Sequence, residues 1–110
     1  MIELFRYQRK DGSEPFSEWL DSLRDKTAQA RIRVRLLRVQ AGNMGDAKSV
    51  GEGVIELRLP IGPGYRVYLG RHGEAVVILL CGGNKSTQEA DIERAKEYWT
   101  EWKGRQPWLS

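Results

Sequence analysis

The sequence is poor in the residues that build covalent or metal-held scaffolds. Its 110 residues contain one cysteine, Cys81, and one histidine, His72. A single cysteine excludes an intrachain disulfide framework, and a single histidine leaves a histidine-based triad or a zinc site with too few members. Cys81 lies in an apolar run, where we expect a buried, unreactive thiol. The fold must therefore depend on a hydrophobic core, and we expect no metal or other cofactor.

Long apolar segments and phosphate-binding loops are also missing. No segment approaches the ~20 apolar residues that a membrane helix needs. The start of the chain, Met-Ile-Glu-Leu-Phe-Arg, lacks the basic and apolar regions of a signal peptide. Gly62-Pro63-Gly64 indicates a turn rather than a Walker loop, and Gly82-Gly83 is more typical of strand-to-helix geometry than of a phosphate site. We therefore expect a cytoplasmic protein without membrane contact.

The composition is that of a globular domain with a basic skew. Hydrophobic residues make up 40% and charged residues 30% of the chain, and the length predicts one domain over 1–110. Eighteen lysines and arginines meet fifteen acids, which gives a formal charge of +3 and a pI near 9.2. This skew is compatible with nucleic-acid binding but does not establish it.

Apolar periodicity predicts alternating strands and helices. Strands are expected at 2–7, 54–59, 65–71 and 74–81, with a further short strand at 47–51; helices are expected from Pro15 to about Leu23, from Asp25 to Gln40, and from a Ser86–Glu89 capping box to about Lys103. The run 74–81 is apolar almost throughout, which is typical of a central strand covered on both faces. An irregular tail is expected over 104–110. The order predicts an α+β domain with helices packed on an antiparallel sheet.

One face of the predicted sheet carries a polar set. Glu56 and Arg58 share a face of their strand, as do Arg66 and Tyr68 on the next. RNA cleavage without metal needs a base for the 2′-OH, cations for the phosphorane and an acid for the leaving oxygen. Candidates for these roles are Glu56, Arg58, Arg66, Lys85 and either Tyr65 or Tyr68. A solvated sheet face is the alternative interpretation, since charged residues are common there.

A second basic set lies on the predicted helix over 25–40. Arg24, Arg31, Arg35 and Arg38 recur at spacings of seven, four and three, so they fall on one side of a helix. The side is either a solvated face or a surface for phosphate or an acidic partner.

Several segments resemble one known family. They are Gly45–Arg58, Gly62–Tyr68, Leu79–Gln88 and Asp91–Lys96. In this order and spacing they are similar to the addiction-module killer proteins, a HigB-like branch of the RelE/ParE toxin superfamily. Together with the two helices expected upstream, the resemblance covers nearly the whole chain. It departs from the frequent Gly-Gly-Asp-Lys pattern at one position, where this chain has Asn84.

The resemblance implies a fold, an activity and partners. The fold would have two N-terminal helices and a C-terminal helix on a twisted antiparallel sheet. RelE-like members cut mRNA on the ribosome without metal, which implies catalytic roles for Arg58, Arg66 and Lys85, with Glu56 as a candidate base. Candidate RNA contacts are Lys48, Tyr65, Tyr68, Arg71, Arg31, Arg35 and Arg38.

The implied partners are the ribosome with its mRNA and a cognate antitoxin. The antitoxin would be a helix-turn-helix protein, and operator DNA would be contacted only through it. Two other functions stay open at this point. One is non-catalytic inhibition of DNA gyrase, as by ParE-type members, and the other is a non-toxic nucleic-acid-binding module.

Overall fold

The computed structural model describes residues 1–105, which form an α+β domain, the class predicted from the sequence. In chain order the elements are β1 (Glu3–Arg6), α1 (Pro15–Ser22), α2 (Lys26–Gln40), β2 (Ala47–Gly51), β3 (Val54–Leu59), β4 (Tyr65–His72), β5 (Val76–Asn84), the 3-10 helix η1 (Lys85–Thr87) and α3 (Gln88–Gly104). Strand β2 confirms the short strand expected at 47–51. Helix α3 includes Gly104, which was expected to start the tail, and residues 106–110 of that tail lie outside the described residues.

The described strands form one mixed sheet in the order β1-β5-β4-β3-β2. Strands β2 to β5 form an antiparallel meander, whereas β1 pairs with β5 in parallel, with Glu3 opposite Val76. The expectation of a purely antiparallel sheet is therefore wrong at β1. Alternating residues indicate a strand, but its partner and direction depend on how the chain returns through α1 and α2.

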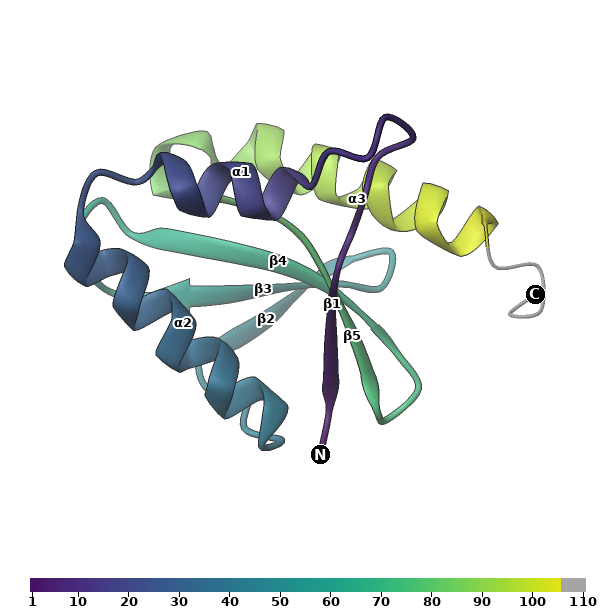
Figure 1. The fold of residues 1–110 in the computed structure, drawn as a ribbon, viewed down its shortest axis with the longest axis horizontal. Coiled ribbons are helices and arrows are strands. Elements are labelled where there is room, and N and C mark those ends of the chain that lie inside the picture. The colour runs from purple at the N-terminus through teal and green to yellow at the C-terminus, as the bar shows by residue number, and fades with distance from the viewer. Residues whose placement is uncertain (106–110) are drawn as a thin grey trace.

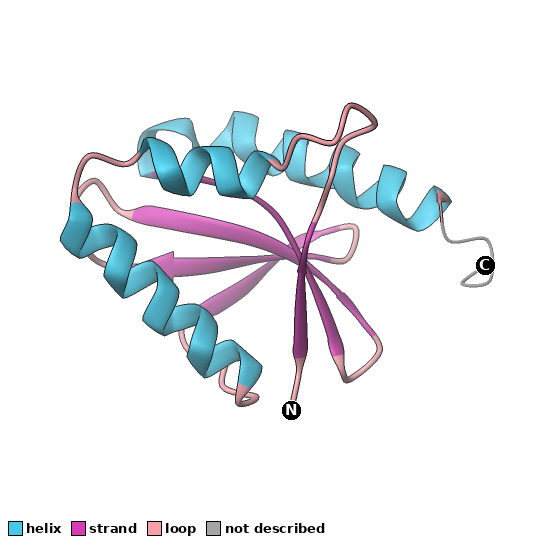
Figure 2. Cartoon of the chain, in the orientation of Figure 1, coloured by secondary structure: helices cyan, strands magenta, loops and turns pink. Residues whose placement is uncertain are grey.

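The sheet lies between two helical layers (Figures 1 and 2). Helices α1 and α2 cover one face, where Phe16 and Ile32 belong to a core cluster with Leu57. Helix α3 lies on the other face, where Trp99 belongs to a second cluster with Val54. Residues 77–83 of β5 are all buried, which confirms the prediction of a central strand covered on both faces.

One glycine on each face makes room for a tryptophan. A Cβ atom built on Gly82 would lie 2.2 Å from Cε3 of Trp19 in α1, and one built on Gly70 would lie 2.3 Å from Cε3 of Trp99 in α3. Real Cβ atoms do not come this close, so both indole rings sit directly on backbone that has no side chain. The two glycines thus allow a helix to approach the sheet closely from either side.

Two of the three α-helices within residues 1–105 begin as the sequence predicted, and the third does not. Pro15 occupies the first turn of α1, and the Asp25 side chain accepts a hydrogen bond from Ala28 N at 3.1 Å at the start of α2. The capping box expected from Ser86 and Glu89 is wrong. The Asn84 side chain caps η1 instead, and α3 begins at Gln88 because this 3-10 turn separates strand from helix.

Candidate functional site on the open sheet face

Register brings the predicted polar residues of the sheet to one face. Glu56 lies opposite Lys48 of β2 on one side and opposite Tyr68 of β4 on the other, while Arg58 lies opposite Arg66. Directly opposed residues on neighbouring strands project to the same side of a sheet. This is the α3 side, but α3 packs mainly on β5 and less on β3. The polar residues therefore occupy the part of this face that α3 leaves open.

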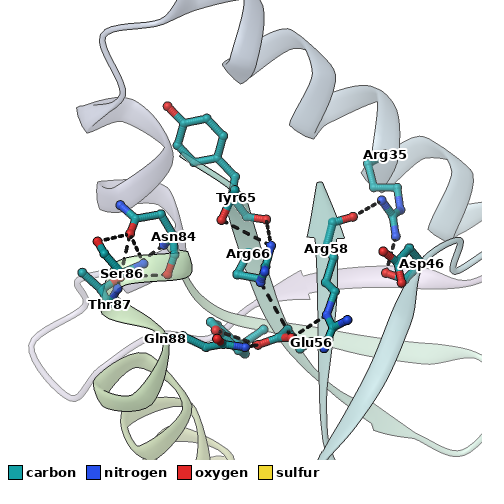
Figure 3. Close-up of polar contacts among 12 residues, drawn as sticks. Arg35, Asp46, Glu56, Arg58, Tyr65, Arg66, Asn84, Ser86, Thr87 and Gln88 are labelled. Atoms are coloured by element: carbon teal, nitrogen blue, oxygen red, sulfur yellow. Dashed lines mark hydrogen bonds and ion pairs between the residues drawn. The ribbon is translucent and has the colours of Figure 1, made fainter. Parts of the chain in front are cut away.

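Glu56 is the centre of the site. Its side chain is fully buried, and both of its carboxylate oxygens are occupied (Figure 3). Oε1 accepts a hydrogen bond from Arg58 Nε at 3.0 Å and lies 3.8 Å from Arg66 Nε. Oε2 accepts from Tyr68 Oη at 3.0 Å and from Gln88 Nε2 at 2.8 Å. Two cations and two neutral donors from β3, β4 and α3 thus converge on one carboxylate.

These partners keep Glu56 ionised in the interior. Burial alone raises the pKa of a carboxyl group, but the hydrogen bonds from Gln88, Arg58 and Tyr68 and the charge of Arg66 outweigh it. The pKa of Glu56 therefore lies below its ordinary value. A low pKa and two occupied oxygens make Glu56 a poor proton acceptor and a good anchor for the two arginines.

The two arginines differ in exposure. The Arg58 side chain is 34% exposed and the Arg66 side chain only 12%. Arg66 Nη1 also donates long hydrogen bonds to the carbonyl oxygens of Gly64, at 3.3 Å, and of Tyr65, at 3.4 Å. Arg66 Nε is buried and has no hydrogen-bond partner within residues 1–105. Arg66 is thus held in place by its neighbours, while Arg58 offers its guanidinium to solvent.

Lys85 lies beside this pair. A Cβ atom built on Gly64 would be 3.4 Å from Lys85 Cβ and 3.6 Å from Arg66 Nη1, so the two cationic residues flank the same glycine. Lys85 is exposed and begins η1 directly after β5. The candidate catalytic residues Glu56, Arg58, Arg66 and Lys85 therefore lie in one region of the molecule.

The structure separates the two candidate tyrosines. Tyr65 points to the α1–α2 face, where its ring is buried 6.1 Å from the Trp19 ring (Figure 3). Tyr68 points to Glu56 and is fully buried, and burial together with the charge of Glu56 raises the pKa of its hydroxyl. Both rings are buried, so neither can serve as the RNA contact expected from the sequence. An alternating pattern gives the face of a residue but not what covers that face.

The arginines of α2 do not join the site. Arg31 and Arg38 are exposed on α2, which covers the opposite face of the sheet. Arg35 donates to three backbone carbonyls, of Met44 at 3.0 Å, of Arg58 at 2.7 Å and of Asp46 at 2.7 Å. Figure 3 shows the contacts with Arg58 and Asp46. Its guanidinium is thereby engaged in holding α2 to β3 and the start of β2. The expectation of a free phosphate contact is wrong for Arg35.

The remaining candidates lie at the borders. Lys48 of β2 is exposed and lies directly opposite Glu56, on the same face of the sheet. Arg71 is exposed near the β4–β5 turn, where its Nη2 donates to the Glu74 carbonyl oxygen at 3.2 Å. Lys48 can therefore extend the basic surface of the site, whereas Arg71 lies toward the opposite end of β4 from Arg66.

Two residues gain a role that the sequence did not reveal. Gln88, in the first turn of α3, connects that helix to Glu56 across 32 positions of sequence, and no local pattern signals such a contact. Asn84 Oδ1 accepts from Ser86 N at 2.9 Å and from Thr87 N at 3.3 Å. Aspartate also caps in this way, so asparagine at this position, where the pattern that the sequence resembles has aspartate, is compatible with the same turn.

Other kinds of site find little support in the described part of the chain. Residues 1–105 contain no group of three or more histidine, cysteine, aspartate or glutamate side chains that could hold a metal ion. The Cys81 thiol is buried, and burial raises its pKa to about 12, as expected of an unreactive cysteine. Within the same range no helix is both long and apolar enough to cross a bilayer.

The geometry defines a class of protein. It is a small α+β domain with an arginine pair held by a buried carboxylate on an open sheet face. Such a pair can bind phosphate groups and stabilise negative charge that develops on them.

Comparison with known proteins assigns the chain to a family. Models of known protein families give no match. A protein of Haemophilus influenzae, described as "Uncharacterized protein", is 53% identical over 81 residues, which cover 74% of this chain and 82% of that protein. The chain belongs to the same family as this Haemophilus protein.

Proposed function

We propose that the protein is the toxin of a type II toxin–antitoxin module and a metal-independent endoribonuclease that cleaves mRNA on the ribosome. The observation that carries the proposal is the arginine pair of the open sheet face, Arg58 and Arg66, held by Glu56. The segment similarity to HigB-like members of the RelE/ParE superfamily supports it. In that superfamily cations of the sheet serve RNA cleavage.

The residues of the site favour electrostatic catalysis. Guanidinium groups stay protonated and form bidentate contacts with phosphate oxygens. Arg58, 34% exposed, is accessible to an incoming phosphate, and Arg66 lies directly opposite it on β4. Together they would stabilise the extra negative charge of a phosphorane, which forms when a 2′-oxygen attacks the neighbouring phosphorus.

The roles of Glu56 and Lys85 follow from their surroundings. Glu56 is buried with both oxygens occupied, so we assign it to positioning the arginines rather than to abstracting a proton. Lys85 is exposed beside Arg66 and can add a third cation on the leaving-group side or along the RNA backbone. Lys48 would extend this basic surface at the edge of the sheet.

The proposal includes a location and partners. The protein would act in the cytoplasm, where ribosomes and mRNA are found. A cognate antitoxin, a helix-turn-helix protein, would neutralise it and would connect the pair to operator DNA.

Arg66→Ala tests the catalytic assignment. Induced in a bacterial host, this variant should no longer arrest growth, because loss of a transition-state cation costs about 3–4 kcal/mol. Arg33→Ala is the matched control, since Arg33 is an exposed arginine of α2 on the other side of the sheet and its loss should leave growth arrest unchanged. An Arg66→Ala protein that folds and is as toxic as the unaltered protein would overturn the assignment.

Mapping of RNA ends separates the nuclease from the alternatives. Induction of the unaltered protein should produce mRNA ends within translated codons, and an inhibitor of translation initiation, which keeps ribosomes off the mRNA, should abolish them. Intact mRNA with gyrase-dependent DNA breaks would instead indicate a gyrase inhibitor. Normal growth, with intact mRNA and DNA, would indicate a non-toxic binding module.

A further inference from the structure

Helix α2 carries positive charge without compensation. Its fifteen residues include five cations, Lys26, Arg31, Arg33, Arg35 and Arg38, and no acid. None of the ion pairs found among residues 1–105 involves this helix. Arg35 is held by backbone carbonyls, but Arg31, Arg33 and Arg38 are exposed. An anionic partner would thus meet unpaired cations on α2.

The same helix exposes large apolar side chains. Val34 is 47% exposed and Leu37 63%, and only Met1 and Phe5 share this property among the described residues. Ala30, Val34 and Leu37 are spaced by four and three residues, so they form one stripe along the helix. Because neither α1 nor the sheet covers this stripe, α2 is apolar on its outer side as well as on the side that faces the core.

A groove runs beside the stripe. Its volume is about 430 Å³, and it lies between α2 and the end of β3. Val34 of the helix and Leu59, Pro60 and Ile61 of the strand end line it, and Arg31 and Arg38 stand along it. Three hydrogen bonds of Arg35 fix the helix against β2 and β3, so the groove exists before any partner arrives. A preformed groove reduces the entropy lost on binding.

The chemistry of the groove selects its occupant. Phosphate groups would satisfy the arginines but would leave Val34 and Leu37 in contact with water. A second copy of the chain could offer the acids of α3, but no large hydrophobic side chain on the described residues of that helix is exposed. An amphipathic helix with acidic flanks satisfies both properties, since it fills the apolar stripe and pairs with the cations.

We propose that the groove along α2 binds an acidic amphipathic segment of a partner protein. The groove lies on the opposite side of the sheet from Glu56, Arg58 and Arg66, so the bound segment leaves the open sheet face uncovered. The proposal does not depend on the function of that face.

A synthetic peptide provides the direct test. The probe is an acetylated and amidated peptide with leucines at i, i+3, i+4 and i+7 on one side of a helix and glutamates beside them. Titrated into the isotope-labelled full chain, it should shift backbone amide resonances of residues 27–38, of Leu59 and of Ile61. A scrambled peptide of the same composition, which has no apolar stripe, should bind at least about tenfold more weakly. Equal binding of both peptides, or shifts confined to β3 and β4 around Arg58 and Arg66, would overturn the proposal.

Paired variants separate the apolar and the ionic parts. Val34→Ser with Leu37→Ser, and Arg31→Glu with Arg38→Glu, should each weaken peptide binding by about tenfold or more. Lys26→Glu with Arg33→Glu is the matched control: it makes the same change of charge on the same helix at two exposed positions outside the groove lining, and should have a much smaller effect. All substituted side chains are exposed, so these variants should stay folded, which circular dichroism checks.

The other occupants give different results. One other outcome is that labelled single-stranded RNA binds the unaltered chain and the peptide does not. If the Arg31→Glu, Arg38→Glu variant then loses RNA binding while the Val34→Ser, Leu37→Ser variant keeps it, the surface binds nucleic acid and the proposal fails. If sedimentation shows a dimer that the Val34–Leu37 variant dissociates, the occupant is a second copy and the proposal also fails. The Val34–Leu37 variant should still arrest growth if the unaltered chain does, so the groove and the proposed nuclease can fail separately.

Discussion

The two faces of the sheet are both buried at β3, but by different kinds of side chain. On the α1–α2 face, two helices cover the strands with apolar side chains, and fully buried Leu57 is typical of it. On the α3 face, a single helix covers β5 and β4, and the neighbouring residue of β3, Glu56, is equally buried but charged. Successive residues of one strand thus contribute to a hydrophobic core on one side and to an ionic network on the other.

This difference separates stability from function. An apolar core can tolerate many exchanges of similar volume, whereas a buried carboxylate requires each of its partners. Replacing a buried ion pair by apolar residues is often neutral or stabilising, so stability alone does not explain the presence of Glu56. We infer that Glu56 is present because it holds Arg58 and Arg66 in a fixed position on an open surface.

The largest effect is expected for Glu56→Ala. The change leaves Arg58 Nε and the buried Tyr68 hydroxyl without their acceptor and Arg66 without its counter-charge, and loss of one member of a buried ionic network costs about 3–5 kcal/mol. Urea denaturation should show this loss in the free energy of unfolding. Leu57→Ala, the adjacent residue on the opposite face, is the reference and should cost about 2–5 kcal/mol by leaving a cavity.

The two variants should differ in what else they change. Glu56→Ala should also abolish growth arrest, because the arginines lose their fixed position, whereas Leu57→Ala should retain arrest at temperatures where it is folded. If Glu56→Ala were as stable and as toxic as the unaltered protein, the two faces would not differ in the way described above.

A smaller loss of stability is expected from substitutions at Gly70 and Gly82, against which tryptophan rings pack. Gly70→Ala should cost about 1–3 kcal/mol, because overpacking forces buried neighbours to move. Its tryptophan, Trp99, is 4% exposed and stacks on Trp102 with centroids 5.2 Å apart, so it cannot swing away.

Gly82→Ala should cost less than Gly70→Ala. Its tryptophan, Trp19, is only partly buried and can shift outward. Thermal denaturation followed by tryptophan fluorescence measures both variants, and Gly104→Ala, where no atom lies within 4 Å of the added Cβ, should be nearly neutral. The reverse order of the two glycine variants would show that the α1–α2 face is the more rigid one.

The smallest effect is the pH dependence that Glu56 contributes. A carboxyl group with a lower pKa in the folded than in the unfolded state stabilises the fold when ionised. Its contribution is fully present above its ordinary pKa of 4.5 and is lost as the pH falls toward the lower pKa of the folded state. Glu56→Gln should therefore be less stable than the unaltered chain at pH 7, with the difference shrinking as the pH falls below 4.5. A difference that is constant down to pH 3, measured by urea denaturation, would contradict a lowered pKa for Glu56.

Local sequence patterns predicted most of the elements of the fold. The 3.6-residue period of α1, the alternation in β3 and the continuous apolar run of β5 each reflect a local burial pattern, which is why these elements were found. The parallel pairing of β1 and the cap at Asn84 were not. Both depend on contacts with other segments of the chain, and the hydrophobic periodicity within one element contains no information about such contacts.

The candidate site was predicted in part for the same reason. Alternation placed Glu56 with Arg58, and Arg66 with Tyr68, and strand register then brought the two pairs together. Tyr65 and Arg35 were assigned wrongly, because a polar or aromatic residue in a suitable pattern can equally serve the interior, as a buried ring or as a clamp on backbone carbonyls.

The sequence by itself determined that this chain folds as an α+β domain without disulfides, with a basic and polar set on its central strands. These properties follow from composition and from periods of two and 3.6, which are local. Only the tertiary structure decided that Glu56 is buried and Arg58 open, that Gln88 reaches across from α3, and that α2 keeps an apolar stripe between unpaired arginines. Burial and hydrogen-bond partners depend on segments far apart in the chain, so they exist only once helices and sheet have packed together.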